Sequence, residues 1–258
     1  MSKERGLLQQ WPKDGPPLAW KIKGIGSGYG GPSIAAGRIY GMSNRGDDEF
    51  VWSLSETDGK ELWALRLASA LTAGMAQGKE GTGCTPTVDG ERLYVLGQSG
   101  DLACLQAKDG KFIWRRNLTN DFGGRIPTWR YNESPLVDGD KVVCTPGGRE
   151  ATIVALDKLT GELIWKTEVP EPSGGNSEGP DARRGGGRPG FRESGASYSS
   201  AIAIDFEGQR QYVQFTAKTL VGVAASDGKL LWRYDRPANK SRVHALPNLF
   251  NNTRDFVP

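Results

Sequence analysis

The sequence predicts an all-β fold, a partial β-propeller of about four four-stranded blades. A short phrase, Asp-Gly or Thr-Gly followed by a few residues and a tryptophan, recurs along the chain, and one hairpin and one tryptophan per unit of about 40 to 50 residues are typical of propellers. Polar and apolar residues alternate within the phrase, as in a half-buried strand. Glycine makes up 36 of 258 residues, which suits short strands joined by turns. The copies are Asp58–Trp63, Asp109–Trp114, Thr160–Trp165 and Asp227–Trp232.

Each unit is predicted to be four antiparallel strands, and the unit at about residues 83–118 shows this most clearly. The stretches CTPTV, RLYVLG, DLACLQA and FIWRRNL each have strand character, and glycine-containing turns separate them. We expect two-residue type I′ turns at the Asp-Gly pairs, because glycine adopts a positive φ without a steric clash. The expected strands of this unit are 92–97, 102–106 and 112–117, with turns at Asp89-Gly90 and Asp109-Gly110. The other units cover about residues 30–67, 133–169 and 196–235.

The segments outside the units indicate a ring that is open at both ends. Leu18–Ile22, within the phrase PLAWKI, resembles the outer strand of a blade whose earlier strands are missing. Residues 170–195 form a Gly-, Pro- and Arg-rich insert, expected to be a flexible surface loop because it has little apolar surface to bury. Residues 236–258 lack strand alternation and are predicted to be an irregular, truncated end, with Val243–Pro258 poorly ordered. Open blade edges favour association with another chain.

Composition excludes several classes of function. The net charge is only +3, with both signs spread along the chain, so no basic stripe for nucleic acid is present. No apolar run reaches membrane-spanning length, and the first residues lack the apolar core of a signal peptide. His244 is the only histidine, which leaves little material for a zinc site or a Ser-His-Asp triad. The cysteines are expected to be buried free thiols, although a Cys84–Cys104 bridge stays open at this point. They are Cys84, Cys104 and Cys144.

The repeat resembles the PQQ-like, or quinoprotein alcohol dehydrogenase-like, β-propeller family. Its tryptophan-docking motif, AxDxxTGxxxW, is matched in full by VALDKLTGELIW, Val154–Trp165. The other copies keep the glycine and the tryptophan but have Ser55, Gln106 or Ala224 in place of the motif's aspartate. The similarity is greatest to exported bacterial PQQ-binding-like and BamB-like repeat proteins. The family includes PQQ-dependent dehydrogenases and the cofactor-free BamB, both with eight blades, so this chain is expected to be about half a ring.

The resemblance implies a structural role for the repeat residues. Tryptophans at these positions wedge between neighbouring blades in the family, so we assign structural docking roles to Trp63, Trp114, Trp165, Trp232, Asp157 and Gly161. PQQ dehydrogenases hold Ca²⁺ with Glu, Asn and Asp and often stack PQQ on a vicinal disulfide. The chain has no Cys-Cys pair, and no motif supplies that ligand set. No catalytic, cofactor-binding or metal-binding residue is therefore predicted.

The candidate ligand-facing residues lie in the connection between the second and third units. Aromatic and arginine side chains are enriched at binding hot spots, and loops at a propeller's face carry binding functions. The alternative is that Trp129 and Tyr131 simply cap the neighbouring blade. The candidates are Arg125, Trp129, Arg130, Tyr131 and Glu133.

Two functional hypotheses follow, together with a weaker third. The first is a non-catalytic scaffold for protein–protein contacts in the bacterial cell envelope, with a periplasmic or extracellular full-length parent. The second is a fragment of a PQQ-dependent alcohol or sugar oxidoreductase, which would require PQQ and Ca²⁺. The third is a carbohydrate-binding propeller, for which aromatic loop residues are the only indication. Fold alone does not decide among them, because function depends on the site.

Overall fold

The computed structural model describes residues 5–6, 10–70, 81–170, 195–217 and 219–235. Sixteen strands, β1 to β16, form four antiparallel four-stranded sheets in which strands adjacent in sequence are also adjacent in space. The predicted all-β fold is confirmed. The expectations for residues 171–194 and 236–258, including their loop arginines and His244, lie outside the described residues.

The four sheets follow one another along the chain, each with the same strand order. The first sheet contains β1 (Ser33–Ala35), β2 (Arg38–Arg45), β3 (Asp48–Ser55) and β4 (Glu61–Ser69). The second contains β5 (Thr87–Asp89), β6 (Arg92–Leu96), β7 (Asp101–Gln106) and β8 (Phe112–Asn117). The third contains β9 (Leu136–Asp138), β10 (Lys141–Cys144), β11 (Ile153–Asp157) and β12 (Leu163–Thr167). The fourth contains β13 (Ile202–Phe206), β14 (Gln209–Phe215), β15 (Thr219–Ala224) and β16 (Leu230–Asp235).

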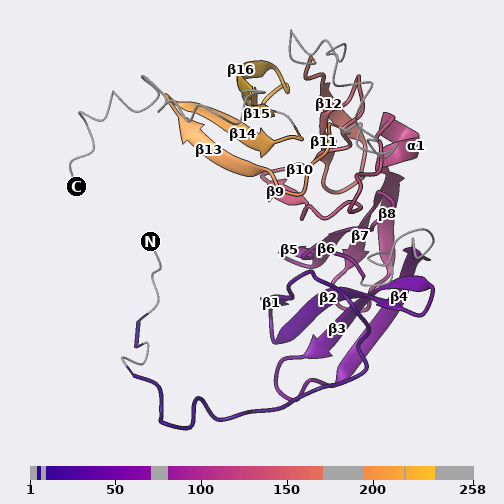
Figure 1. Ribbon diagram of the computed structural model, residues 1–258, viewed down its shortest axis with the longest axis vertical. Helices are drawn as coiled ribbons and strands as arrows, with labels where there is room; N and C mark the ends of the chain where they lie inside the picture. Colours follow the sequence, from indigo (N-terminus) through magenta and orange to yellow (C-terminus); the bar gives the residue numbers. More distant parts are fainter. Residues whose placement is uncertain (1–4, 7–9, 71–80, 171–194, 218, 236–258) are drawn as a thin grey trace, which may run out of the picture.

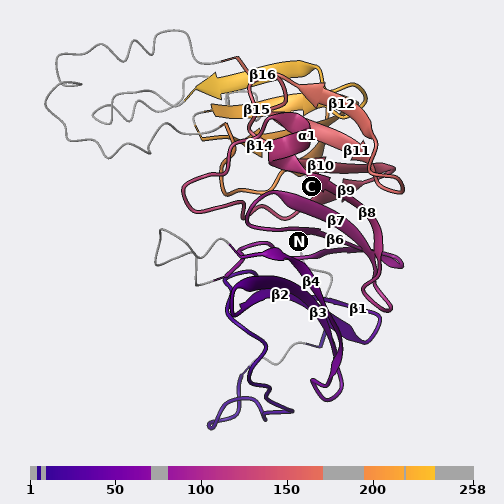
Figure 2. The same ribbon diagram turned by 90° about the vertical axis from the view of Figure 1, so that its right-hand side faces the viewer.

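The sheets are arranged in an arc (Figure 1). The first strand of each sheet lies on the concave side, with β1 next to β5 and β5 next to β9, and β4, β8 and β12 lie on the convex side. Figure 2 shows the sheets stacked one above another, each twisted relative to the next. This is the arrangement of consecutive propeller blades.

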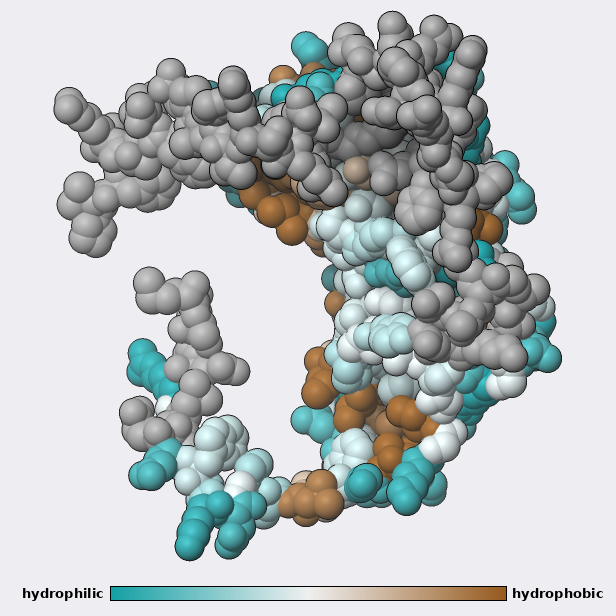
Figure 3. Space-filling view, viewed as in Figure 1, coloured by the Kyte–Doolittle hydropathy of each residue, from teal (hydrophilic) through white to brown (hydrophobic). Residues whose placement is uncertain are grey.

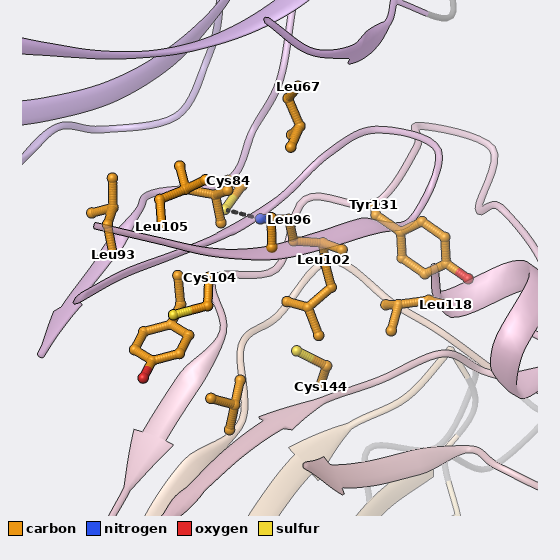
Figure 4. Close-up of a cluster of buried hydrophobic side chains, with 14 of the residues drawn as sticks. Leu67, Cys84, Leu93, Leu96, Leu102, Cys104, Leu105, Leu118, Tyr131 and Cys144 are labelled. Carbon is orange, nitrogen blue, oxygen red and sulfur yellow. Dashed lines mark hydrogen bonds between the residues drawn. The ribbon is translucent and has the colours of Figure 1, made fainter. Parts of the chain in front are cut away.

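The core lies between the sheets. One cluster of buried side chains joins the first three sheets, and a second joins the third and fourth. The third sheet is covered on both faces, so that Val142 belongs to one cluster and its neighbour Val143 to the other. The three cysteines are buried free thiols, and Figure 4 shows them among the leucines of the second sheet and its neighbours. The Leu96 backbone N–H donates to Cys84 Sγ over 3.4 Å.

The repeated phrase forms a longer turn than we predicted. In the third sheet, the N–H of Gly161 donates to the carbonyl of Asp157 (2.8 Å) and the N–H of Asp157 donates to the carbonyl of Glu162 (2.7 Å), which encloses four loop residues. The same bonds recur in the other sheets, and only the glycine of each loop has a positive φ. The prediction of a type I′ turn at Asp109-Gly110 was therefore wrong, because that turn needs positive φ at both central residues. Positive φ at both residues occurs instead at Ala36-Gly37 and Glu207-Gly208.

Asp157 stabilises the turn of the fully matched motif. Its Oδ1 accepts hydrogen bonds from the backbone N–H groups of Leu159 and Thr160, each at 2.8 Å. These bonds favour the ionised carboxyl and hold the pKa of Asp157 below its usual value. In the other three turns, an aspartate immediately before the glycine accepts a bond from a lysine N–H instead; these residues are Asp58, Asp109 and Asp227.

A tryptophan from one sheet packs on the turn glycine of the next. The indole of Trp114 lies against Gly161, where a Cβ would be 2.7 Å from Trp114 Cδ2, so no other residue fits without movement. Its N–H donates to the carbonyl of the first loop residue, Lys158. The same pair of contacts repeats four times, on Gly59, Gly110, Gly161 and Gly228. The indole N–H donors and their carbonyl acceptors are Trp20 and Glu56 (2.9 Å), Trp63 and Ala107 (3.1 Å), Trp114 and Lys158 (3.0 Å), and Trp165 and Ala225 (3.2 Å).

Trp232 and the Leu18–Ile22 segment differ from the sequence-based expectations. Trp232 lies on Gly222 of its own sheet and donates to Gln211 Oε1 (2.8 Å), because no further sheet follows among the described residues. Leu18–Ile22 forms no strand in the structure, since a strand requires a hydrogen-bonded neighbour. The connection after the second sheet contains a short helix that we did not predict, α1 (Leu118–Phe122), which Asn117 caps through its side chain.

We predict that Trp114→Ala destabilises the protein by about 3–5 kcal/mol, the usual range for removing a buried aromatic side chain. Trp114 is buried between two sheets and loses both its packing and its bond to Lys158. Lys111→Ala at the beginning of the same segment removes an exposed side chain and should change stability by no more than about 0.5 kcal/mol. Urea unfolding of both variants provides the measurement. Equal midpoint shifts would contradict a docking role for Trp114.

Candidate functional site

The candidate site lies at one end of the sheets, which we call the connection end. Here the chain passes from each sheet to the next and from the second strand to the third strand of each sheet. The four tryptophan turns lie between the third and fourth strands, at the opposite end of the strands. The connection end contains two buried carboxyl groups and an exposed aromatic patch.

Glu49 is the first buried carboxyl group and links the first two sheets. It lies on β3 and is fully buried, and both of its oxygens are 3.2 Å from the backbone nitrogen of Gln98, which follows β6. Thr82, in the segment between the sheets, also bonds to it. Burial disfavours the charged form and raises the pKa of Glu49 to about 8, although the hydrogen bonds oppose this shift.

Glu133 is the second buried carboxyl group, and it lies where the third sheet meets the fourth. Its Oε1 accepts a 2.5 Å hydrogen bond from the backbone N–H of Thr145. The side chain of Gln214, on β14, extends this contact to the fourth sheet by donating to Thr145 Oγ1 (2.6 Å) and to the carbonyl of Ser199 (3.0 Å). Burial raises the pKa of Glu133 to about 7.

These groups stabilise the interior and are not placed to act on a ligand. Glu49 and Glu133 are both shielded from solvent, so a substrate at the surface cannot reach their protons. The same burial raises the pKa of the Cys84 thiol to about 12, with further contributions from the negative charges of Glu49 and Glu133. A thiol that stays protonated at neutral pH is a poor nucleophile and a poor metal ligand. Cys144 is similar, and burial raises its pKa well above the usual value.

An aromatic patch, which consists of Trp129 and Tyr198, is exposed at this end. Trp129 is 47% exposed and Tyr198 is 45% exposed. The hydroxyl of Tyr198 accepts a hydrogen bond from the backbone N–H of Trp129 (3.2 Å). The patch therefore joins the connection after the second sheet to the segment that leads into the fourth. Exposed aromatic side chains of this kind are typical of protein-binding surfaces.

The structure separates the five predicted ligand-facing residues. Arg125 and Trp129 are exposed, and Arg130 is half-buried in a left-handed conformation with a φ of 70°. Tyr131 and Glu133 are not ligand-facing, which corrects the prediction. Tyr131 is buried against Gly100 and donates its hydroxyl hydrogen to the carbonyl of Pro146 (2.8 Å). The capping alternative is therefore correct for Tyr131.

Sequence reasoning missed several residues of this end. Tyr198 has no neighbouring motif, and its proximity to Trp129 depends on how the third and fourth sheets pack. Glu49 follows two aspartates in an apparently exposed turn, DDEF, which gives no sign of its burial. The alternation of β3 gives no signal either, because the residues that share a face with Glu49 are Val51, Ser53 and Ser55, and two of these three are polar.

The described residues do not form a site that fits Ca²⁺ with a quinone. No group of three or more His, Cys, Asp or Glu side chains converges anywhere in the described ranges. Calcium needs several converging oxygens, whereas Glu49 and Glu133 each face backbone N–H groups. We therefore derive no chemical step through PQQ or Ca²⁺.

We predict that Glu49→Gln reduces the loss of stability as pH rises. The folded-state pKa of about 8 lies above the ordinary value of 4.5. The stability that protonated Glu49 contributes is therefore fully present below about pH 4.5 and is lost as pH rises through 8. Gln remains neutral and keeps an acceptor for the N–H of Gln98. The Tm of the variant relative to that of the wild type should therefore be higher at pH 8 than at pH 5. Glu91→Gln, at an exposed position, is the matched control, and parallel pH profiles for wild type and Glu49→Gln would refute the assignment.

Comparisons with known proteins agree with this architecture. The chain is 24% identical over 155 residues to the outer membrane protein assembly factor BamB of Moranella endobia, covering 59% of this chain and 37% of that protein. It is 29% identical over 126 residues to the quinohemoprotein alcohol dehydrogenase ADH IIB of Pseudomonas putida, covering 45% of this chain and 17% of that enzyme. The chain thus spans well under two thirds of the curated relatives it matches.

A solved structure has the same fold. The crystal structure of BamB from Moraxella catarrhalis superposes with a TM-score of 0.56 at 14% identity, over 84% of this chain and 54% of that one. Among the described residues, no helix is long and apolar enough to cross a membrane. A family model described as outer membrane protein assembly factor BamB matches residues 47–253, which is most of the chain. The chain therefore belongs to the family described as outer membrane protein assembly factor BamB.

Proposed function

We propose that this chain is part of a non-catalytic β-propeller scaffold that binds other proteins in the bacterial cell envelope. The observation that carries the proposal is the exposed aromatic patch of Trp129 and Tyr198 at the connection end. The relatives named as outer membrane protein assembly factors support the envelope location and a protein as the partner. In this proposal the scaffold needs no cofactor.

The chemistry of the patch favours a polypeptide partner. Trp and Tyr provide large, rigid contact areas with one polar atom each, and they dominate binding energy at protein interfaces. Arg125, also exposed, lies four residues before Trp129 and offers a planar group for a carboxylate or a peptide carbonyl. Glu49 and Glu133 at the same end are buried, so neither is available for acid–base chemistry on a ligand at this surface.

We expect a photocrosslinking residue, p-benzoylphenylalanine, at position 129 to form discrete adducts with envelope proteins of the source bacterium. Leu159 is a matched control position, since it is 48% exposed in a turn at the opposite end of the sheets. The adducts should be absent with the probe at 159 and should weaken when Tyr198→Ala is added to the position-129 variant. The same adduct pattern from both positions would refute binding at the patch.

The alternative is a fragment of a PQQ-dependent alcohol or sugar oxidoreductase. The observation in its favour is the similarity to the Pseudomonas putida quinohemoprotein alcohol dehydrogenase. The matched part is 17% of that enzyme, so the groups that define its activity can lie outside the shared region. The alternative therefore needs a direct test.

We predict that the chain does not bind PQQ. The sequence has no vicinal cysteines, and the described carboxyl groups do not converge on a cation site. Titration of PQQ with and without Ca²⁺, followed by tryptophan fluorescence, should show no saturable quenching after correction for the inner-filter effect. Stoichiometric binding would replace the scaffold proposal with the oxidoreductase alternative.

A further inference from the structure

The carboxamide of Gln214, on β14, joins two sheets at the connection end. Its Nε2 donates to Thr145 Oγ1 (2.6 Å), just after β10, and to the carbonyl of Ser199 (3.0 Å), in the segment before the fourth sheet. The Ser199 carbonyl decides which way the carboxamide is turned, because only the NH₂ group can donate to it. Gln214 Oε1 is therefore a buried oxygen that has no hydrogen-bond donor among the described residues.

Thr145 connects this carboxamide to the buried carboxyl group of Glu133. The backbone N–H and the hydroxyl of Thr145 both bond to Glu133. An ionised carboxyl group only accepts hydrogen bonds, so the donors run in one direction, from Gln214 through Thr145 Oγ1 to Glu133. All three side chains are buried, so a group that loses its partner stays unpaired at a cost in free energy.

Protonation of Glu133 reverses the direction of these bonds. The neutral carboxyl group has an O–H that needs an acceptor. If Thr145 Oγ1 accepts it, the Thr145 hydroxyl hydrogen points to Gln214, which must then present Oε1 in place of its NH₂ group. Gln214 Nε2 lies 3.5 Å from Glu133 Oε2, so the same rotation also lets Oε1 accept the proton directly. In both cases the carbonyl of Ser199 faces an oxygen instead of a donor, and the two oxygens repel.

The surroundings of Glu133 leave its charge sensitive to pH. Burial raises the pKa of Glu133 to about 7, and its hydrogen bonds oppose this shift. β14 faces it with Gln214, which does not titrate. The titratable groups that interact with it are kept protonated at neutral pH by burial, which raises their pKa values. They are Tyr131 on its own connection, Cys84 before the second sheet, and Cys144 on β10.

The segment that contains Ser199 carries one half of the aromatic patch. Ser199 follows Tyr198, whose hydroxyl accepts a hydrogen bond from the backbone N–H of Trp129 (3.2 Å). On its other side, the hydroxyl oxygen of Ser200 accepts a bond from the backbone N–H of Ser134 (2.8 Å). Residues 198–200 thus hold the fourth sheet against the connection after the second. Loss of the bond to the Ser199 carbonyl weakens the attachment of this whole segment.

We infer that Glu133 is a proton switch for the aromatic patch. Its ionised form keeps the Tyr198 segment in place against Trp129, and its protonated form releases that segment. On the face shown in Figure 3, the described surface over the second and third sheets is mostly hydrophilic or neutral, so few apolar side chains there can replace a ring that leaves the patch. The consequence for binding rests on the proposed function: the partner binds more tightly at pH 8 than at pH 5.5.

Amide hydrogen exchange in the full chain, followed residue by residue by NMR, tests the switch. The reporters are the backbone N–H groups of Trp129 and Ser134, because both donate to residues 198–200. After correction for the intrinsic pH dependence of exchange, we expect their protection factors to be about tenfold lower at pH 5.5 than at pH 8. Protection factors that are equal at the two pH values would overturn the inference.

Two variants assign the pH dependence to one carboxyl group. Glu133→Gln cannot ionise but keeps an acceptor for the N–H of Thr145, so the reporters should have low protection at both pH values. Glu49→Gln removes the other buried carboxyl group with a raised pKa and is the matched control, which should keep the pH dependence of the wild type. A pH dependence that persists in Glu133→Gln, or that disappears in Glu49→Gln, would contradict the role of Glu133.

Photocrosslinking from position 129 separates the switch from the proposed function. With p-benzoylphenylalanine at this position, the adduct yield should fall from pH 8 to pH 5.5, and Glu133→Gln should lower it at both pH values. Exchange that depends on pH, together with no adducts at either pH, would support the switch and refute the proposed function. Equal adduct yields at both pH values, together with exchange that is independent of pH, would overturn the switch and leave the proposed function in place.

Discussion

The contact between a tryptophan and a turn glycine is the interaction on which the rest of the structure depends. Glycine is required because a Cβ at Gly161 would overlap the ring of Trp114, and because its φ is positive. The indole N–H is satisfied at the same time by the carbonyl of Lys158, so the polar atom of a buried ring does not remain unpaired. Repetition of this contact fixes the distance and the rotation between successive sheets. Each sheet is thus stabilised mainly by its two neighbours.

At the opposite end of the sheets, a different kind of contact joins the same neighbours. Glu49 and Glu133 accept hydrogen bonds from backbone N–H groups that loops would otherwise leave unpaired in the interior. Because both carboxyl groups are buried, their pKa values are raised, and their proton occupancy is linked to stability. The consequence for function is that the connection end presents Trp129 and Tyr198 to solvent and keeps Glu49 and Glu133 inside.

This division explains how one repeat supports unlike functions among the relatives. The inter-sheet contacts at the turn end use turn glycines and tryptophans, so they place no constraint on the connections at the other end. A chain of this family can therefore carry a binding surface, and the similar dehydrogenases can carry catalytic groups, on the same scaffold. The docking site filled by Trp20 shows the modularity directly, because an isolated segment makes the contacts of a complete neighbouring sheet.

The sequence by itself determined the repeat, the all-β fold and the strand positions, because alternation and turn glycines are local properties of the chain. It also identified Trp129 as an exposed aromatic residue at a connection. It misassigned the tight turns, because an Asp-Gly pair is compatible with several loop types. The backbone hydrogen bonds from Gly161 to Asp157 and from Asp157 to Glu162 are what identify a four-residue loop. Tyr131 follows Trp129 by two residues but is buried, because it packs against Gly100 and donates to the carbonyl of Pro146, which belong to two different sheets.

The tertiary structure alone decided which residues share the connection end. Tyr198 meets Trp129 across a separation of 69 residues, and Glu49 meets Gln98 across 49. Such contacts follow from the packing of separate sheets, which no local pattern encodes. The structure likewise decided the role of Trp20, whose segment looked like a strand and instead docks without pairing. The physical reason is that a strand exists only with a hydrogen-bonded partner, whereas a tryptophan needs only a glycine turn to pack against.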